Sequence, residues 1–115
     1  MIHEMRVYVT SPGGLVSLNE NFAKTTIPLF NRHGIRSFGY WTEEIGTNNR
    51  LVYIVEFDDF RHREEAWASF RGDVDWQAHM RSLNQIGPPV VQRIYNTILV
   101  PTVSSPNSPK GGNGL

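Results

Sequence analysis

The sequence of 115 residues contains no cysteine. A chain without thiols forms no disulfides, has no cysteine nucleophile and cannot build a zinc site from cysteines. It also has no excess of charge, because eleven Lys and Arg residues balance eleven Asp and Glu residues, and no basic run stands out to contact phosphates. We therefore expect no nucleic acid among its partners.

Long apolar runs are missing as well. No stretch approaches the roughly 20 apolar residues of a membrane-spanning helix, and the start, MIHEMRVYV, lacks the basic and apolar regions of a signal peptide. We expect a cytoplasmic protein that does not insert into membranes. The four histidines lie far apart and show no ligand spacing such as HxxxH, so we expect neither a metal site nor a bound cofactor.

The pattern of apolar residues predicts a single domain with four strands and three helices. The predicted strands are 2–10, 35–42, 50–57 and 90–100, and the predicted helices are 15–33, with a bend near Pro28, about 58–72 and about 73–86. The order is typical of the α+β class, in the form of a ferredoxin-like βαββαβ sandwich. We expect this domain to cover residues 1–106 and residues 107–115, which are rich in Pro, Gly, Ser and Asn, to form a disordered tail.

Large side chains recur at helical spacing in the second half of the chain. Phe60, Trp67 and Phe70 form one such stripe, and Trp76, Met80 and Leu83 form another. Of these residues, we expect Trp67, Phe70, Trp76 and Met80 to pack into a core rather than to line a ligand site.

The strand predicted at 50–57 is apolar on both faces. Leu51, Tyr53, Val55 and Phe57 alternate with Val52, Ile54 and Glu56. One layer of helices covers only one face of a sheet, and an apolar face left open normally marks an interface. A homodimer would cover that second face, because a twofold axis makes one surface complementary to itself.

Four motifs of this chain resemble those of the NIPSNAP family. They are Glu4-x-Arg6-x-Tyr8, Pro28-x-x-x-x-His33-Gly34-Ile35, Gly39-Tyr40-Trp41-Thr42-x-Glu44-Ile45-Gly46-x-x-Asn49 and Asp75-Trp76-Gln77. The resemblance runs from about residue 2 to residue 106. It implies a dimeric α+β barrel, in which the sheets of two protomers face each other around a central cavity. Similar barrels host oxygenases, cyclases, isomerases, decarboxylases and heme enzymes, so the fold does not name an activity.

The first strand carries the strongest candidates for chemistry. Glu4, Arg6 and Tyr8 share one face at a spacing of roughly 7 Å, and in a barrel they would line the cavity. Arg6 is the candidate for holding an anion or enolate, Tyr8 is a candidate for exchanging a proton, and Glu4 is a candidate for substrate binding. The alternative is a structural ion pair or a polar contact between protomers.

The remaining candidates lie elsewhere in the chain. Glu44, at the end of the second strand, is a second candidate base, against the alternative that 43–49 is only a hairpin turn. Trp41, Tyr53, His33 and Trp76 are candidates for substrate binding. His33 also has a structural explanation at a helix C-terminus, and Trp76 has one in core packing. Members of the resembling family often have a histidine where this chain has Tyr53, which removes one proton carrier.

Two functions follow from these residues, and whether the protein is an enzyme at all stays open. The first is a cofactor-independent enzyme of the cyclase, isomerase or oxygenase type, active in secondary metabolism, that carries out acid–base chemistry on an apolar, carbonyl-bearing metabolite. The second is a noncatalytic binding or adaptor domain that acts through protein partners. Polar residues that converge on an otherwise apolar interior favour the first, whereas the absence of a complete catalytic constellation in the sequence is the reason to keep the second as the alternative.

Overall fold

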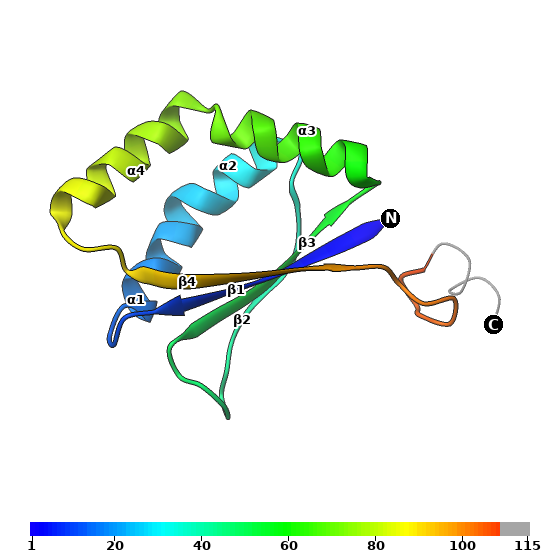
Figure 1. Cartoon of the computed structure of the whole chain (residues 1–115), viewed down its shortest axis with the longest axis horizontal. Coiled ribbons are helices and arrows are strands. Elements are labelled where there is room, and N and C mark those ends of the chain that lie inside the picture. Colours follow the sequence, from blue (N-terminus) through cyan, green and yellow to red (C-terminus); the bar gives the residue numbers. More distant parts are fainter. Residues whose placement is uncertain (109–115) are drawn as a thin grey trace.

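In the computed structural model, helices cover one face of a single antiparallel sheet (Figure 1). The structure describes residues 1–108. The strands are β1 (Ile2–Thr10), β2 (Arg36–Thr42), β3 (Arg50–Phe57) and β4 (Val91–Leu99). The helices are α1 (Leu15–Asn21), a π-helical turn (Phe22–Thr26), α2 (Ile27–Arg32), α3 (Phe60–Arg71) and α4 (Val74–Ile86), and the first three run on as one helix.

The strand order is β2-β3-β1-β4, with every pair antiparallel. This order places β3 and β1 in the centre and is that of a ferredoxin-like sandwich, so the predicted α+β class is confirmed. The polar segment 43–49 joins β2 to β3 as a hairpin, as its composition predicted.

The first long helix keeps its apolar side chains on the sheet by widening one turn. Leu18, Phe22, Thr26 and Phe30 are buried and lie four residues apart, which is more than the 3.6 residues of an α-helical turn. The π-helical turn takes up this difference. The predicted bend near Pro28 is thus a wide turn directly upstream of it, where a proline disrupts the backbone hydrogen bonds of the preceding turn.

Aspartate side chains cap the starts of α3 and α4. The Asp59 side chain accepts a hydrogen bond from the backbone N–H of His62 at 2.8 Å, and Gly72 ends the helix. The Asp73 carboxylate then accepts from the backbone N–H groups of Asp75 and Trp76 at 2.7 and 3.1 Å. These bonds satisfy N–H groups that a helix start leaves without partners.

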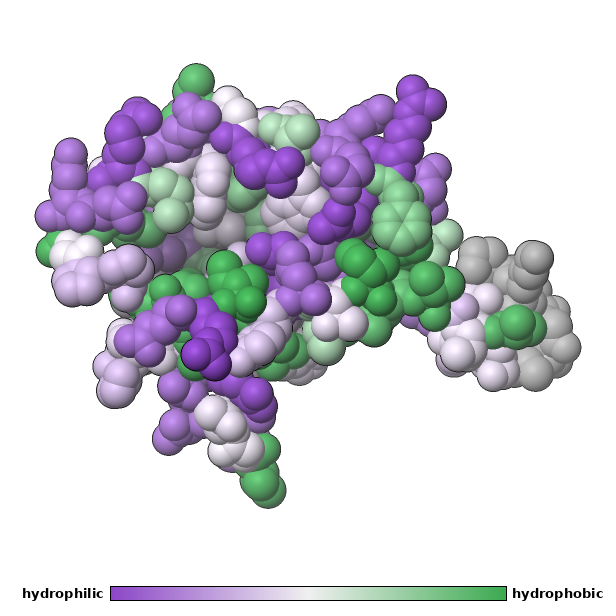
Figure 2. Space-filling view, in the orientation of Figure 1, coloured by the Kyte–Doolittle hydropathy of each residue, from purple (hydrophilic) through white to green (hydrophobic). Residues whose placement is uncertain are grey.

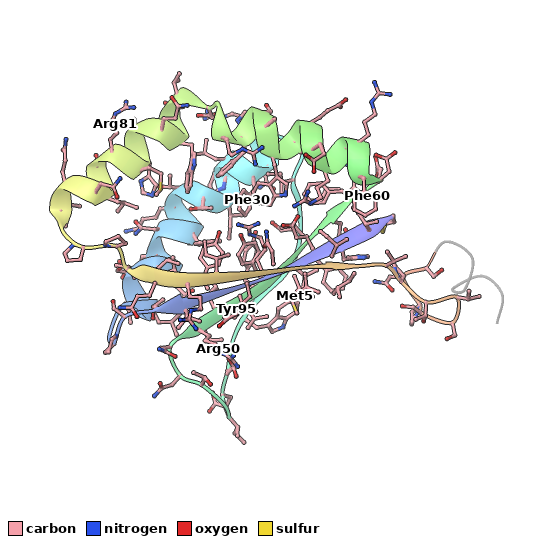
Figure 3. All side chains as sticks on the ribbon, viewed as in Figure 1. Met5, Phe30, Arg50, Phe60, Arg81 and Tyr95 are labelled. Atoms are coloured by element: carbon pink, nitrogen blue, oxygen red, sulfur yellow. The ribbon has the colours of Figure 1, made fainter. Side chains whose placement is uncertain are left out.

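The core lies between the sheet and the helices, where Phe30 points toward the sheet (Figure 3). Trp67 and Phe70 belong to it, as predicted. Phe60, at the first position of α3, is 56% exposed where the helix extends past the packed layer (Figure 3). The prediction for Met80 was wrong, because this side chain of α4 is 37% exposed. Helix α4 buries none of its residues fully, so its apolar stripe only borders the core.

The opposite face of the sheet has no helix over it. Met5 and Tyr95 lie on this side of the sheet, which we call the open face (Figure 3). Phe38, Trp41 and Leu99 add further exposed apolar surface. Within residues 1–108 no helix is long and apolar enough to cross a membrane.

The chain leaves the sheet after β4 and turns near the first strand. Asn107 Nδ2 lies 3.5 Å from His3 Nε2, and Ser105 donates a hydrogen bond to the Asn107 side chain. The predicted tail therefore starts with two described residues, and its remainder, 109–115, lies outside the described part of the chain.

Candidate functional site

A cavity of about 410 Å³ lies between the sheet and the helix layer. Its walls come from β1, β4, the π-helical turn, α2, α3 and α4. Figure 2 shows the surface hollowed between the helices and β4. The lining residues are Arg6, Tyr8, Phe22, Thr26, Phe30, Arg63, Glu64, Trp67, Phe70, Arg71, Trp76, Ile94 and Asn96.

Arg6 brings a positive charge into this cavity from the centre of the sheet. Its side chain is only 15% exposed. The guanidinium donates to Glu4 Oε2 at 2.9 Å and to Tyr8 Oη at 3.3 Å, and it lies 4.7 Å from the centre of the Trp67 ring. Burial disfavours the charge, but the neighbouring Tyr53 and Tyr8 and the hydrogen bond to Glu4 outweigh it and raise the pKa of Arg6 above its ordinary value.

Glu4 is the counterion that holds Arg6 in place. Its carboxylate is completely buried and accepts hydrogen bonds from Arg63 Nε at 2.8 Å and Trp67 Nε1 at 2.9 Å, in addition to the bond from Arg6. Burial alone would raise the pKa of Glu4, but the donors from Arg63, Trp67 and Arg6 outweigh it and lower the pKa. Glu4 is therefore an ionised support behind Arg6, and its oxygens are occupied.

The Tyr8 hydroxyl sits between a cation and a second phenol. It accepts hydrogen bonds from Arg6 at 3.3 Å and from the Tyr53 hydroxyl at 3.1 Å. A phenolic oxygen that accepts two hydrogen bonds still has its own hydrogen to donate. Tyr8 lines the cavity, so this hydrogen is available to a ligand there. Tyr53 lies behind it, fully buried, and burial raises the pKa of Tyr53 well above its ordinary value.

Aromatic rings make up most of the remaining wall. Phe70 and Trp76 lie with ring centres 4.5 Å apart, and Phe22 and Phe30 meet edge to face at 6.2 Å. Such surfaces bind flat apolar groups, and a few polar groups among them fix orientation. The arrangement suits a small molecule with a planar body and a polar end at Arg6 and Tyr8.

Two predicted site residues lie away from this cavity. Trp41 is 47% exposed on the open face, where its ring lies across Gly39. Glu44 lies exposed in the hairpin loop and is not part of the cavity wall. Its neighbour Glu43 accepts two hydrogen bonds from Arg50, at 2.6 and 2.9 Å, and these bonds lower the pKa of Glu43. This loop therefore has a structural explanation.

His33 connects helices rather than facing the cavity. Its Nε2 donates to Asp73 Oδ2 at 2.6 Å, and its Nδ1 lies 2.6 Å from Ser69 Oγ. The bond from His33, followed by those from the backbone of α4 and from Arg32, holds the pKa of Asp73 well below its ordinary range. His33 thereby ties the end of α2 to the junction of α3 and α4.

The structure brings together Arg6, Tyr8 and Trp76 in the cavity wall, with Glu4 and Tyr53 directly behind it. All of these strand residues face the helices of their own chain, not the open face that two facing sheets would enclose. Sequence reasoning missed Arg63, Arg71, Thr26 and Asn96. The spacing of Arg63, Trp67 and Arg71 at four-residue intervals places them on one side of α3, which was the available signal.

A smaller pocket of about 210 Å³ lies on the open face. His3 Nε2 there donates a hydrogen bond to Glu56 Oε2 at 2.9 Å, beside Phe38 and Ile54. Among residues 1–108, no group of three or more His, Asp or Glu side chains is arranged to hold a metal ion.

Comparison with known proteins gives a consistent match across the chain. The sequence profile of the NIPSNAP family matches residues 3–106. The mouse protein NipSnap homolog 3B is 32% identical over 111 residues, which are 96% of this chain and 44% of the mouse protein. This chain therefore spans less than half the length of that relative.

Solved structures agree with this match. An uncharacterized NIPSNAP domain protein from Burkholderia xenovorans is 25% identical, with a TM-score of 0.82 over 93% of this chain and 100% of its own. A NIPSNAP family protein from Agrobacterium tumefaciens is 23% identical, with a TM-score of 0.81 over 92% of this chain and 97% of its own. SnoaB from Streptomyces nogalater, a cofactor-independent oxygenase, is 14% identical, with a TM-score of 0.58 over 87% of this chain and 91% of its own.

Proposed function

The chain belongs to the NIPSNAP family, and we propose that it is an enzyme that carries out proton transfer on a small, apolar, carbonyl-bearing molecule bound in the cavity between its sheet and its helices. The observation that carries this proposal is the Arg6–Tyr8 pair, in which a buried cation and a hydroxyl with a free hydrogen meet at 3.3 Å in an aromatic cavity. Protein groups alone supply the proposed chemistry.

Arg6 would bind the carbonyl oxygen and stabilise the negative charge that grows on it in an enolate. Among the described residues, only Glu4 and Tyr8 accept hydrogen bonds from its guanidinium, so other N–H groups of Arg6 remain for a ligand oxygen. A fixed cation in a site that excludes water stabilises an oxyanion without reorganising solvent. Glu4 keeps this cation in place through the transfer.

Tyr8 would move the proton. In the direction from enolate to ketone, the Tyr8 O–H bond breaks, its proton forms the new C–H bond, and the electron pair stays on the phenolate oxygen. Arg6 and Tyr53 already donate hydrogen bonds to that oxygen. The phenolate then recovers a proton from water, and the reverse sequence removes a proton from carbon.

The likeness to SnoaB supports this proposal only through the fold, because the two chains share 14% identity. We also propose that two copies pair through their open faces to form a dimeric α+β barrel. The exposed Phe38, Trp41 and Tyr95 on an otherwise uncovered sheet support this pairing. We further propose a cytoplasmic location, in keeping with the sequence.

Deuterium exchange tests the chemistry without knowledge of the natural substrate. Acetophenone at millimolar concentration in D₂O should gain deuterium at its methyl carbon faster with the protein than in buffer, as followed by NMR. Tyr8→Phe should slow this exchange by roughly a hundredfold or more, because it removes only the transferring hydroxyl. Tyr95→Phe removes a hydroxyl on the open face, which bonds Arg93, and should leave the rate unchanged.

Two results would contradict the proposal. One is exchange no faster than in buffer with folded wild-type protein. The other is equal exchange by wild type and Tyr8→Phe. A protein that binds ketones but does not exchange them would instead be the noncatalytic binding domain.

A further inference from the structure

The exposed edge of the cavity contains a cation, Arg71, that has no side-chain partner within residues 1–108. Arg71, the last residue of α3, lines the cavity and is exposed. Within residues 1–108 its guanidinium makes no hydrogen bond or ion pair, whereas Arg63 is bound to Glu4 and Glu64. Arg6 is likewise bound to Glu4.

The cavity therefore has a positive charge left over at its entrance. Three arginines line it, and within residues 1–108 the carboxylates that form ion pairs with them are Glu4 and Glu64, both of which are engaged by Arg63. The unneutralised charge is that of Arg71. A guanidinium with free, forked N–H groups fits a carboxylate, which it can bind through two parallel hydrogen bonds.

Aromatic surface lies between this cation and the deep one. Trp67 is four residues before Arg71 on the same side of α3, and the Arg6 guanidinium lies 4.7 Å from the Trp67 ring centre. Phe70 and Trp76 continue the wall toward the mouth. A ligand that fills the cavity would thus meet a cation at each end and rings along its length.

We infer that the substrate is a planar aryl or conjugated ketone that carries a carboxylate at the end remote from the carbonyl. The carboxylate binds Arg71 at the mouth, the planar body packs against Trp67 and Trp76, and the carbonyl oxygen reaches Arg6 and Tyr8. This assignment rests on the proposed function, because it takes the Arg6 end of the cavity as the reacting end.

Isothermal titration calorimetry at low ionic strength tests the assignment with two probes of equal shape. The first is 4-acetylbenzoate, which has a ketone at one end and a carboxylate at the other, and the second is the neutral 4-acetylbenzamide. Wild-type protein should bind the acid roughly tenfold more tightly than the amide, which is the usual size of one charge-assisted contact. Added salt should reduce the difference.

Arg71→Gln should abolish this preference and leave the affinity for the amide unchanged. Arg81→Gln is the matched control, because Arg81 is an exposed arginine of α4 outside the cavity wall (Figure 3). It removes the same charge and should keep the full preference for the acid.

Equal binding of acid and amide by wild type, no measurable binding of either, or an undiminished preference in Arg71→Gln would overturn the assignment. The acetophenone exchange assay separates this failure from failure of the proposed function, because acetophenone has no carboxylate. If wild type then exchanges acetophenone faster than Tyr8→Phe does, the proposed proton transfer is supported and only the assignment of a carboxylate-bearing substrate fails.

Discussion

The Glu4 carboxylate is the group on which Arg6, Arg63 and Trp67 converge, and it is fully buried. The sequence shows that Glu4 and Arg6 share a strand face, and this spacing allows a structural ion pair between them. The sequence cannot show that α3 brings two more donors from about 60 residues away. Because these donors occupy the Glu4 carboxylate, Glu4 holds Arg6 in position and does not contact a ligand itself.

Glu4→Gln tests this role at the residue scale. The substitution keeps the shape of the side chain but leaves Arg6 without a counterion and Arg63 with only the exposed Glu64, so it should lower the free energy of unfolding by roughly 3 kcal/mol at pH 7. Urea unfolding followed by tryptophan fluorescence measures this loss. Glu64→Gln, which alters an exposed partner of Arg63, should cost less than about 1 kcal/mol.

The Glu4 contribution should depend on pH in one direction. Folding lowers the pKa of Glu4 below its ordinary 4.5, so the folded state stabilises the ionised form. The stabilisation is fully present above that ordinary value and is lost as the pH falls through the lower, folded pKa. The stability difference between wild type and Glu4→Gln should therefore shrink below pH 4.5, and a constant difference down to the acid transition would contradict the assignment.

At the scale of elements, helix starts and stops were predictable because each depends on a few adjacent residues. Asp59 and Asp73 cap α3 and α4 close to the predicted starts of these helices, and Gly72 ends α3. The π-helical turn was not predicted, because a four-residue spacing is also compatible with an α-helix over a short stretch. The exposure of Met80 was missed for a different reason, since periodicity shows which side of a helix is apolar but not how closely that side packs on the core.

The π-helical turn gives an element-scale prediction. In a regular α-helix, Leu18 and Phe30 are 12 positions apart, so their side chains would differ in direction by about 120° around the helix axis. At 11 positions apart, the difference would be only about 20°. Deletion of the exposed Lys24 should therefore restore a regular helix with both residues still facing the sheet, and thermal stability should stay within a few degrees of wild type. Because Phe22 and Thr26 would shift in the cavity wall, exchange of acetophenone should fall at least tenfold.

Lys24→Ala is the control, because it keeps the chain length and should preserve both stability and exchange. Circular dichroism and the NMR exchange assay measure the two properties. Full exchange activity in the deletion variant would mean that the wide turn does not shape the site.

At the scale of the whole molecule, the fold follows from the sequence more completely than the site does. Alternation in β1 and β3 and the order of elements are enough to specify the ferredoxin-like sheet. Which face of β1 carries the cavity was not predictable, because Glu4, Arg6 and Tyr8 alternate with Met5 and Val7 and neither set is clearly an outer face. The structure places the polar set under the helices, with the apolar set on the open face.

The open face carries the prediction about assembly. Ile54→Asp places a charge at its centre and should prevent pairing, so sedimentation equilibrium at micromolar concentration should change from dimer to aggregate or unfolded chain. Val74→Asp adds the same charge on the exposed start of α4 and should remain dimeric. For wild type, the unfolding midpoint should rise with protein concentration. A folded wild-type monomer whose unfolding midpoint does not change with protein concentration would rule out the dimeric barrel. It would not rule out the cavity, which lies within one chain.

A crystal structure of the protein with 4-acetylbenzoate would locate the ligand on one side of the sheet or the other. We expect the compound to lie between the sheet and the helices, with its ketone oxygen within hydrogen-bonding distance of Arg6 and Tyr8. Binding on the open face instead, in the pocket beside His3 and Glu56, would contradict it and move the functional site to the opposite side of the sheet.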